Sequence, residues 1–193
     1  MTTGVKGPRP KLLLHVCCGP CSTEVIERLA PDRELVLHFF NPNIWPREEH
    51  DRRMAEAERY AAAHGHRFVR GDWDHAGWQA AVAGSEHEPE GGKRCAACFA
   101  YRLDAAARSA REEGAGLFTT TLSISPHKSA ALVNAAGEEA GRRNGVAFLA
   151  ADFKKKDGFH KSCLRAEEAG MYRQDYCGCE FSMRRKRVDK LKS

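Results

Sequence analysis

Seven of the eight cysteines fall into three groups of close neighbours, and thiols at such spacings bind metals or take part in redox chemistry. The groups are Cys17/Cys18/Cys21, Cys95/Cys98 and Cys177/Cys179. Each lies beside a turn or an expected helix start, where the helix dipole favours the metal-binding thiolate. The three groups together indicate a bound metal, because cysteines that serve only as small buried residues have no reason to recur at these spacings.

Seven thiolates exceed the four ligands that one tetrahedral zinc ion takes. They fit a four-cysteine iron-sulfur cluster with a second metal, or two zinc ions that share a ligand. The C-x-x-C pair taken alone is equally typical of a dithiol redox pair or a structural zinc site. The eighth cysteine, Cys163, stands apart on one face of an expected helix, and we expect it to be a buried free thiol and not a ligand.

The segment from Thr119 to Ser129 is a second candidate site, because it offers hydroxyl groups, backbone N–H groups and Lys128 at an expected helix N-terminus. Such an arrangement suits a phosphate group. The Ser-x-Ser-Pro sequence within it equally serves as a plain helix cap. His127 is consistent with either interpretation.

The composition is that of a soluble protein, with 42% apolar and 30% charged residues among 193. No apolar run approaches the roughly 20 residues of a membrane span, and the run from Leu12 to Leu14 is too short for a signal peptide. We therefore expect a cytoplasmic protein without membrane contact, whose cysteines bind metal and do not form disulfides. The net charge of +5 equals the excess in the tail from Arg184 to Lys192, which favours contact with a polyanion there and at local basic patches.

Alternating strands and helices predict an α/β fold with a parallel sheet. The expected strands span 11–16, 34–40, 66–70, 117–122 and 146–149. Expected helices span 23–29 with Ser22 as N-cap, 46–64 from Pro46, 73–82, 95–113, a segment capped by Ser123–Pro126 with Pro126 in its first turn, and 160–170. We expect one domain over residues 11–193 after a flexible lead-in, residues 1–10. The first two cysteine groups then meet at the carboxyl edge of the sheet, and the third must fold back over that edge.

Five motifs, in chain order, resemble the cobalamin-independent (QueH-type) epoxyqueuosine reductase family. The resemblance extends from Leu12 to Ser182. The motifs are His15–Ser22 (HVCCGPCS), Cys95-x-x-Cys98 with Tyr101-Arg102-Leu103, Thr119–Lys128 (TTTLSISPHK), Phe153–Phe159 (FKKKDGF) and Tyr172–Ser182 (YRQDYCGCEFS).

The resemblance implies a Rossmann-like, adenine-nucleotide α-hydrolase-like domain that completes queuosine biosynthesis. The implied reaction is the two-electron removal of the epoxide oxygen from epoxyqueuosine at the wobble position of tRNA. The implied partners are that tRNA and an unidentified low-potential electron donor. The implied cofactors are a 4Fe-4S cluster, held by Cys18, Cys95, Cys98 and Cys177, and one further iron, held by Cys17, Cys21 and Cys179, which act in catalysis through that iron. Exchange within Cys17/Cys18 or Cys177/Cys179 is compatible with the same motifs.

Two features distinguish this chain from relatives. Some family members carry an aspartate at the position of Cys21, and a thiolate there is a softer, more electron-donating ligand. ATP-using proteins of the same fold carry a Ser-Gly-Gly-x-Asp-Ser loop where this chain has Cys17–Ser22, which argues against ATP chemistry.

The matching motifs also supply candidate substrate contacts. The expected contacts to tRNA are Ser125, His127, Lys128, Lys155, Arg173 and Tyr176, with Lys156 as a further phosphate contact and Tyr172 as a further stacking residue. Unranked candidates for the proton donor are His127, Asp157, Asp175 and Tyr176. Two other function classes fit the cysteines: a zinc-bound RNA-binding module without redox chemistry, and a dithiol oxidoreductase.

Overall fold

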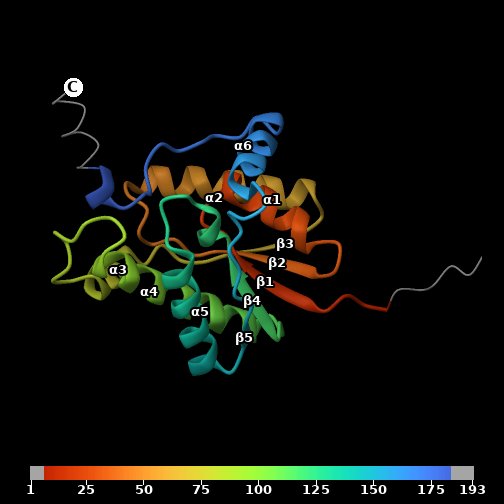
Figure 1. Ribbon diagram of the computed structural model, residues 1–193, viewed down its shortest axis with the longest axis horizontal. Helices are drawn as coiled ribbons and strands as arrows, with labels where there is room; N and C mark the ends of the chain where they lie inside the picture. The colour runs from red at the N-terminus through yellow and green to blue at the C-terminus, as the bar shows by residue number, and fades with distance from the viewer. Residues whose placement is uncertain (1–6, 184–193) are drawn as a thin grey trace, which may run out of the picture.

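A parallel five-stranded sheet runs through the middle of the protein in a computed structural model, which describes residues 7–183 (Figure 1). The strands are β1 (Lys11–His15), β2 (Glu34–Phe39), β3 (Arg67–Arg70), β4 (Leu117–Thr120) and β5 (Ala147–Phe148). Their order is β3-β2-β1-β4-β5. In the centre, Leu13 of β1 lies in register with Val36 of β2 and Phe118 of β4. The chain therefore changes direction across the sheet between β1 and β4, and ligands of open α/β sheets bind at the carboxyl ends of such strands.

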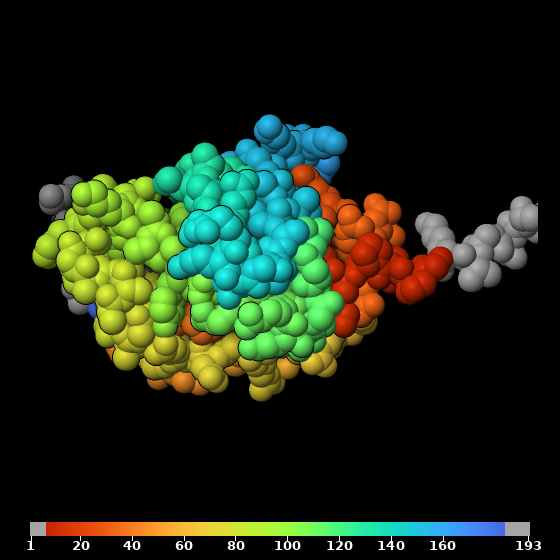
Figure 2. Space-filling model, turned by 90° about the horizontal axis from the view of Figure 1, so that it is seen from below, coloured from red at the N-terminus to blue at the C-terminus, as the bar shows by residue number. Residues whose placement is uncertain are grey.

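Helices cover both faces of the sheet (Figure 1). They are α1 (Gly19–Leu29), α2 (Arg47–Ala63), α3 (His75–Ala81), α4 (Lys93–Glu112), α5 (Ala130–Asn144) and α6 (Gly158–Glu168), with a 3-10 turn η1 (Thr121–Ile124). Leu12 and Leu14 pack into the core cluster on the side of α1, α2 and α6, while Leu13 packs into the cluster formed with α4 and α5. This alternation is what a strand buried on both faces requires. Figure 2 shows α5 in the centre of the surface on one side, with the region of α3 and the start of α4 beside it.

The expected parallel α/β architecture is confirmed, but the start of α1 differs from the sequence prediction. The helix begins at Gly19, and Cys18 occupies the N-cap position in an extended conformation. Ser22 is therefore not the N-cap; its hydroxyl donates a 2.6 Å hydrogen bond to the carbonyl oxygen of Gly19. Pro20 fits the first turn of a helix because proline lacks the N–H that this turn leaves unpaired. The earlier start places Cys21 inside the helix.

The prediction that Ser123–Pro126 caps a helix is wrong. After β4 the chain forms η1, and α5 begins only at Ala130. Ser129 is the N-cap, and its hydroxyl accepts a 3.3 Å hydrogen bond from the N–H of Leu132. The residues between η1 and α5 consequently form a loop, and this loop lines the cavity described below.

The other predicted elements are present with small shifts of their ends. The long helix begins one residue after Pro46, α4 begins two residues before Cys95, and β4 ends at Thr120. No helix within residues 7–183 combines the length and the apolar character needed to cross a membrane. The basic tail from Arg184 to Lys192 lies outside the described residues.

Candidate active site

Three thiols lie together where β1 ends and α1 begins. The sulfur atoms of Cys17, Cys18 and Cys21 are all within 4.8 Å of one another. Thr121, which follows β4, ties this turn to the neighbouring strand: its hydroxyl lies 3.2 Å from the Cys17 sulfur and 3.1 Å from the Cys17 backbone nitrogen. A thiol trio of this size can supply three ligands to one metal ion.

The three thiols differ in acidity because they share hydrogen bonds. The pKa of Cys17 is lowered well below its usual value, since the thiols of Cys18 and Cys21 donate to it. Burial raises the pKa of Cys18 to about 12, and donation to Cys17 raises the pKa of Cys21. Cys17 is therefore the thiol that ionises first, with Lys128 and Arg102 as the nearby positive charges that favour its thiolate.

Four further thiols surround a second, smaller hollow. Cys95 and Cys98 come from the first turns of α4, and Cys177 and Cys179 come from the C-terminal loop. The hollow has a volume of about 20 Å³. Cys98 and Cys179 pack against Trp78 and Val82, and burial raises the pKa of each of these two thiols. The C-terminal cysteines thus do fold back over the carboxyl edge of the sheet, as the sequence predicts.

The C-terminal loop is held in place by the start of α2. Arg53 is 2% exposed, and its guanidinium donates to the carbonyl oxygens of Cys177 (3.2 Å) and Tyr176 (3.5 Å) while it pairs with Glu49 at 2.7 Å. The N–H of Trp45 donates to the carbonyl oxygen of Gly178 at 2.9 Å. Gly178 has φ +119°, and a Cβ there would lie 3.0 Å from the Arg53 guanidinium, so glycine is required between the two cysteines.

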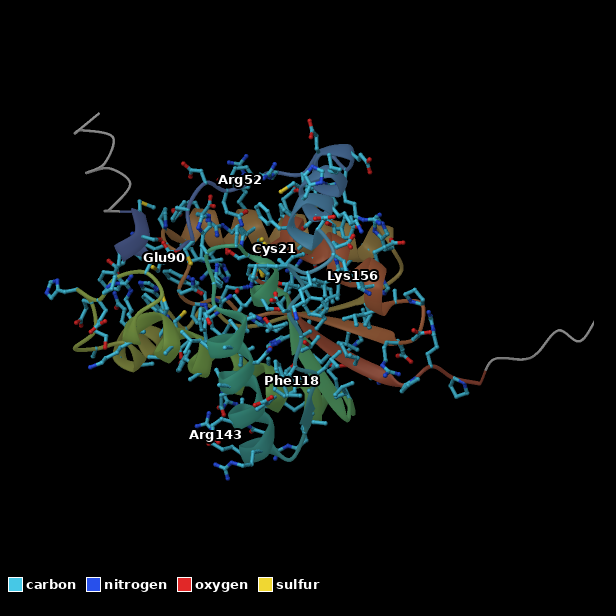
Figure 3. The ribbon with its side chains drawn as sticks, viewed as in Figure 1. Cys21, Arg52, Glu90, Phe118, Arg143 and Lys156 are labelled. Atoms are coloured by element: carbon cyan, nitrogen blue, oxygen red, sulfur yellow. The ribbon has the colours of Figure 1, made fainter. Side chains whose placement is uncertain are left out.

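A cavity of about 390 Å³ opens beside both thiol groups. Its wall includes Cys17, Cys21 and Cys177, and it shares Lys128 and Arg102 with the smaller hollow. Figure 3 shows Cys21 near the centre of the molecule, with Glu90 to one side of it and Lys156 to the other. The volume falls within the usual range of pockets that enclose a small organic group.

Lys128 lies between the two thiol groups. Burial acts to lower the pKa of its amine, but the negative charges of Cys177, Cys17 and Cys21 outweigh burial and raise the pKa above its usual value. Lys128 therefore stays protonated in the cavity wall. Its charge favours anionic ligands, whether thiolates or a substrate phosphate.

Most of the predicted substrate contacts lie together. The cavity is lined by Ser125, His127, Lys128, Arg173, Asp175 and Tyr176. Lys155 and Asp157 are not among its lining residues; both lie in the turn that precedes α6, where Lys155 is exposed. Cys163 is half-buried, contrary to the prediction of a buried thiol, and it lines the same cavity with its sulfur 3.1 Å from an Arg173 guanidinium nitrogen.

Several lining residues were not predicted from the sequence. Phe159 lines the cavity with 40% of its surface exposed. Asn43 is buried between the two hollows, and its side-chain oxygen has no hydrogen-bond partner among the described residues. Glu90 comes from the loop before α4 and also borders both hollows. The available signal was positional: Asn43 follows β2 and therefore lies at the carboxyl edge.

Comparison with known proteins decides the family. The family model described as "Epoxyqueuosine reductase QueH" matches residues 12–185. The chain belongs to the QueH family. An epoxyqueuosine reductase QueH from Streptococcus pyogenes serotype M1 is 37% identical over 187 residues, which cover 94% of this chain and 73% of that protein. The QueH of Haemophilus influenzae is 38% identical over 90% of this chain and 72% of its own length, and that of Thermotoga maritima is 31% identical over 91% and 92%.

Solved structures with low sequence identity support the fold. The U34-tRNA thiolase NcsA from Methanococcus maripaludis, solved with its [4Fe-4S] cluster, aligns with a TM-score of 0.56 at 14% identity, and the match covers 94% of this chain and 64% of the thiolase. A predicted subunit of a tRNA methyltransferase from Methanocaldococcus jannaschii aligns with a TM-score of 0.51 at 13% identity, covering 83% and 89%. These two likenesses support the expected fold, a parallel sheet flanked by helices.

Proposed function

We propose that this QueH member is a tRNA epoxyqueuosine reductase, which removes the epoxide oxygen from epoxyqueuosine at the wobble position with two electrons and two protons. The observation that carries the proposal is that seven cysteines gather in two groups, the Cys17/Cys18/Cys21 trio and the four thiols of the smaller hollow, beside one cavity in a member of this family. Thiolates are the ligands that iron-sulfur clusters take, so the donor set fits the implied cofactor.

The geometry supports a division of the cysteines that differs from the one the resemblance suggests. Cys18 lies with Cys17 and Cys21, where the three sulfur atoms are mutually within 4.8 Å, and not with the C-x-x-C pair. We therefore assign the single iron to these three residues. The four thiols of the smaller hollow, Cys95, Cys98, Cys177 and Cys179, would hold the 4Fe-4S cluster. When bound, the two metal groups supply electrons and a Lewis acid for the epoxide oxygen.

The chain itself supplies the charge and the protons around the substrate. Lys128 and Arg173 line the cavity as cations that suit the phosphates next to the wobble nucleotide. Of the four candidate acids, His127, Asp175 and Tyr176 line the cavity. The Tyr176 hydroxyl donates a 2.6 Å hydrogen bond to the carbonyl oxygen of Trp45, and burial raises the pKa of this tyrosine to about 12. Tyr176 thus keeps its proton at neutral pH, with that proton engaged in the hydrogen bond to Trp45.

The zinc-bound alternative has one observation in its favour. The sulfur atoms of Cys17, Cys18 and Cys21 lie within 4.8 Å of one another, as the ligands of a single zinc ion would. Family membership outweighs this point, since the matching relatives carry the name of a reductase.

The deciding experiment is anaerobic reconstitution with iron and sulfide, followed by metal analysis and reduction of tRNA that contains epoxyqueuosine. We expect about five irons and about four sulfides per chain, and conversion to queuosine. Colourless protein that retains zinc and makes no product would refute the reductase proposal and leave an RNA-binding module. Activity without any metal that is lost on replacement of Cys95 or Cys98 alone would indicate the dithiol oxidoreductase instead.

The division of the cysteines has its own test in single serine variants. Cys98→Ser should lose the cluster, and about four of the five irons with it, whereas Cys18→Ser should lose about one iron and keep the visible spectrum of the cluster. Cys163→Ser is the matched control, because Cys163 lines the cavity but belongs to neither group, and its iron count should equal that of the wild type. Loss of the cluster in Cys18→Ser would restore the division suggested by the resemblance.

A further inference from the structure

Arg102 is a buried cation that has no carboxylate partner among residues 7–183. Its residue is 2% exposed, and it lies one turn after Cys98 on α4. One guanidinium nitrogen donates to the side-chain oxygen of Asn41, another lies 3.9 Å from the Cys98 sulfur, and Nε has no partner among residues 7–183. The same side chain borders both the large cavity and the smaller hollow.

The two other fully buried arginines with described contacts are either paired with a carboxylate or hydrogen-bonded to backbone carbonyl oxygens. Arg53 pairs with the carboxylate of Glu49 at 2.7 Å. Arg94 donates to the backbone carbonyls of Glu86 and Glu88, at 2.8 and 2.6 Å. Arg102 has neither a carboxylate nor a set of carbonyls around it in the described part of the chain. A buried charge without a counter-charge destabilises the fold, and a guanidinium cannot lose its proton to avoid that penalty.

Among the described residues, the group that can carry negative charge and directly contacts Arg102 is the Cys98 thiol, whose sulfur lies 3.9 Å from a guanidinium nitrogen. Arg102 also borders the large cavity whose wall includes Cys17. Asn41 fixes this position, because its amide donates a 2.9 Å hydrogen bond to the carbonyl oxygen of Val16, directly before Cys17. Arg102 is therefore anchored to the sheet edge between the two thiol groups.

We propose that Arg102, oriented by Asn41, is the fixed positive charge that raises the reduction potential of the centre held by the four-cysteine hollow. This inference rests on the proposed function. A centre held by four thiolates carries net negative charge, and reduction adds one electron and thus one more negative charge without breaking a bond to the protein. A cation in a buried site stabilises the more negative state more strongly than it would in water. Arg102 is a positioning and charge-compensating residue, not one that touches the substrate.

The test is to measure the midpoint reduction potential of the reconstituted protein. The protein is titrated with dithionite, and electron paramagnetic resonance monitors the reduced centre. Arg102→Gln should shift the midpoint to a more negative value. Arg102→Lys keeps the charge but lacks the planar fork, so its midpoint should lie closer to the wild type than that of Arg102→Gln. Arg111→Gln is the matched control: it removes the same charge from an exposed position near the end of α4 and should leave the potential unchanged.

A second variant covers the case in which Arg102→Gln does not retain iron. Asn41→Asp keeps the guanidinium and neutralises it with a neighbouring carboxylate, and the midpoint should again become more negative. Equal potentials in the wild type and in Arg102→Gln or Asn41→Asp, at equal iron content, would overturn the inference alone. So would equal shifts in Arg102→Lys and Arg102→Gln, because they would point to packing and not to charge. Failure of the wild type itself to bind iron would overturn the proposed metal centre as well.

Discussion

Replacement of Arg53 by methionine tests whether the start of α2 holds the C-terminal cysteines in place. Arg53 is 2% exposed, and its partner Glu49 is 12% exposed at the side chain. Methionine fills a similar volume but removes the ion pair and the hydrogen bond to the carbonyl oxygen of Cys177 at 3.2 Å. The hydrogen bond to Tyr176, at 3.5 Å, is long enough to contribute little. The change therefore removes the ion pair with Glu49 and one effective hydrogen bond to the C-terminal loop.

The expected cost follows from the charge that remains behind. Breaking a buried ion pair by removing one partner costs about 3–5 kcal/mol, mainly because the other charge stays buried. We expect Arg53→Met to lower the free energy of unfolding by that amount, a large share of the roughly 5–15 kcal/mol that stabilises a folded domain. The double variant Arg53→Met/Glu49→Gln removes the stranded carboxylate charge and should recover about 2 kcal/mol of the loss.

Urea unfolding at pH 7.5 measures both values, and iron analysis after reconstitution reports on the site. Arg53→Met should bind less iron at the four-cysteine hollow, because the loop that carries Cys177 loses its anchor. Glu49→Gln alone keeps the arginine and its contacts to the loop, so its iron content should match the wild type. A cost below about 1 kcal/mol for Arg53→Met, or equal stability of the single and double variants, would refute this reasoning.

Two further predictions concern acid stability and substrate binding. Burial lowers the pKa of His38 from 6.5 to about 4. Between these pH values the folded state therefore binds fewer protons than the unfolded state. The stability that His38 contributes above pH 6.5 is consequently lost as the pH falls. Urea unfolding should show that the wild type loses roughly 2 kcal/mol more than His38→Leu between pH 7.5 and pH 5, and parallel pH profiles would contradict this. Phe159→Ala should raise KM for the tRNA about tenfold with little change in kcat, because stacking on one base contributes about 1–3 kcal/mol. The control is Leu164→Ala, which should change neither constant. Leu164 is 46% exposed on the same helix, and it does not line the cavity. Equal KM values for the two variants would exclude Phe159 as a stacking residue.

The sheet and the convergence of the cysteines were predictable because they depend on local patterns. Short apolar runs such as Lys11–His15 predict buried strands, and their alternation with helices predicts parallel pairing. The carboxyl-edge rule then places turns that follow β1 and β4 side by side, although they are 104 residues apart. The end of each element was harder to predict, since Cys18 takes the N-cap position without a side-chain hydrogen bond and Ser129, not Ser123, caps α5.

The grouping of the thiols and the identity of their supporting residues could not be predicted in the same way. Adjacent cysteines such as Cys17 and Cys18 have the same sequence context, and only the path of the backbone decides which sulfur faces which neighbour. Arg53 and Arg102 each belong to helices whose sequences are rich in charged residues, and nothing local distinguishes them from exposed arginines. Their burial depends on the C-terminal loop and on Asn41, which are distant in sequence.

The position of the site at the switch point explains why two thiol groups and their cations meet there. Parallel strands direct their carboxyl ends to one edge, so the turn that carries Cys17 must lie against the turn that carries Thr121. Helix α4 starts at the same edge, which brings Cys98 to the smaller hollow and Arg102 to the border of both hollows. Buried thiolates need positive charge nearby, and Lys128 supplies a second cation from the loop before α5. The parallel topology therefore assembles the candidate metal ligands and their counter-charges at one edge of the sheet.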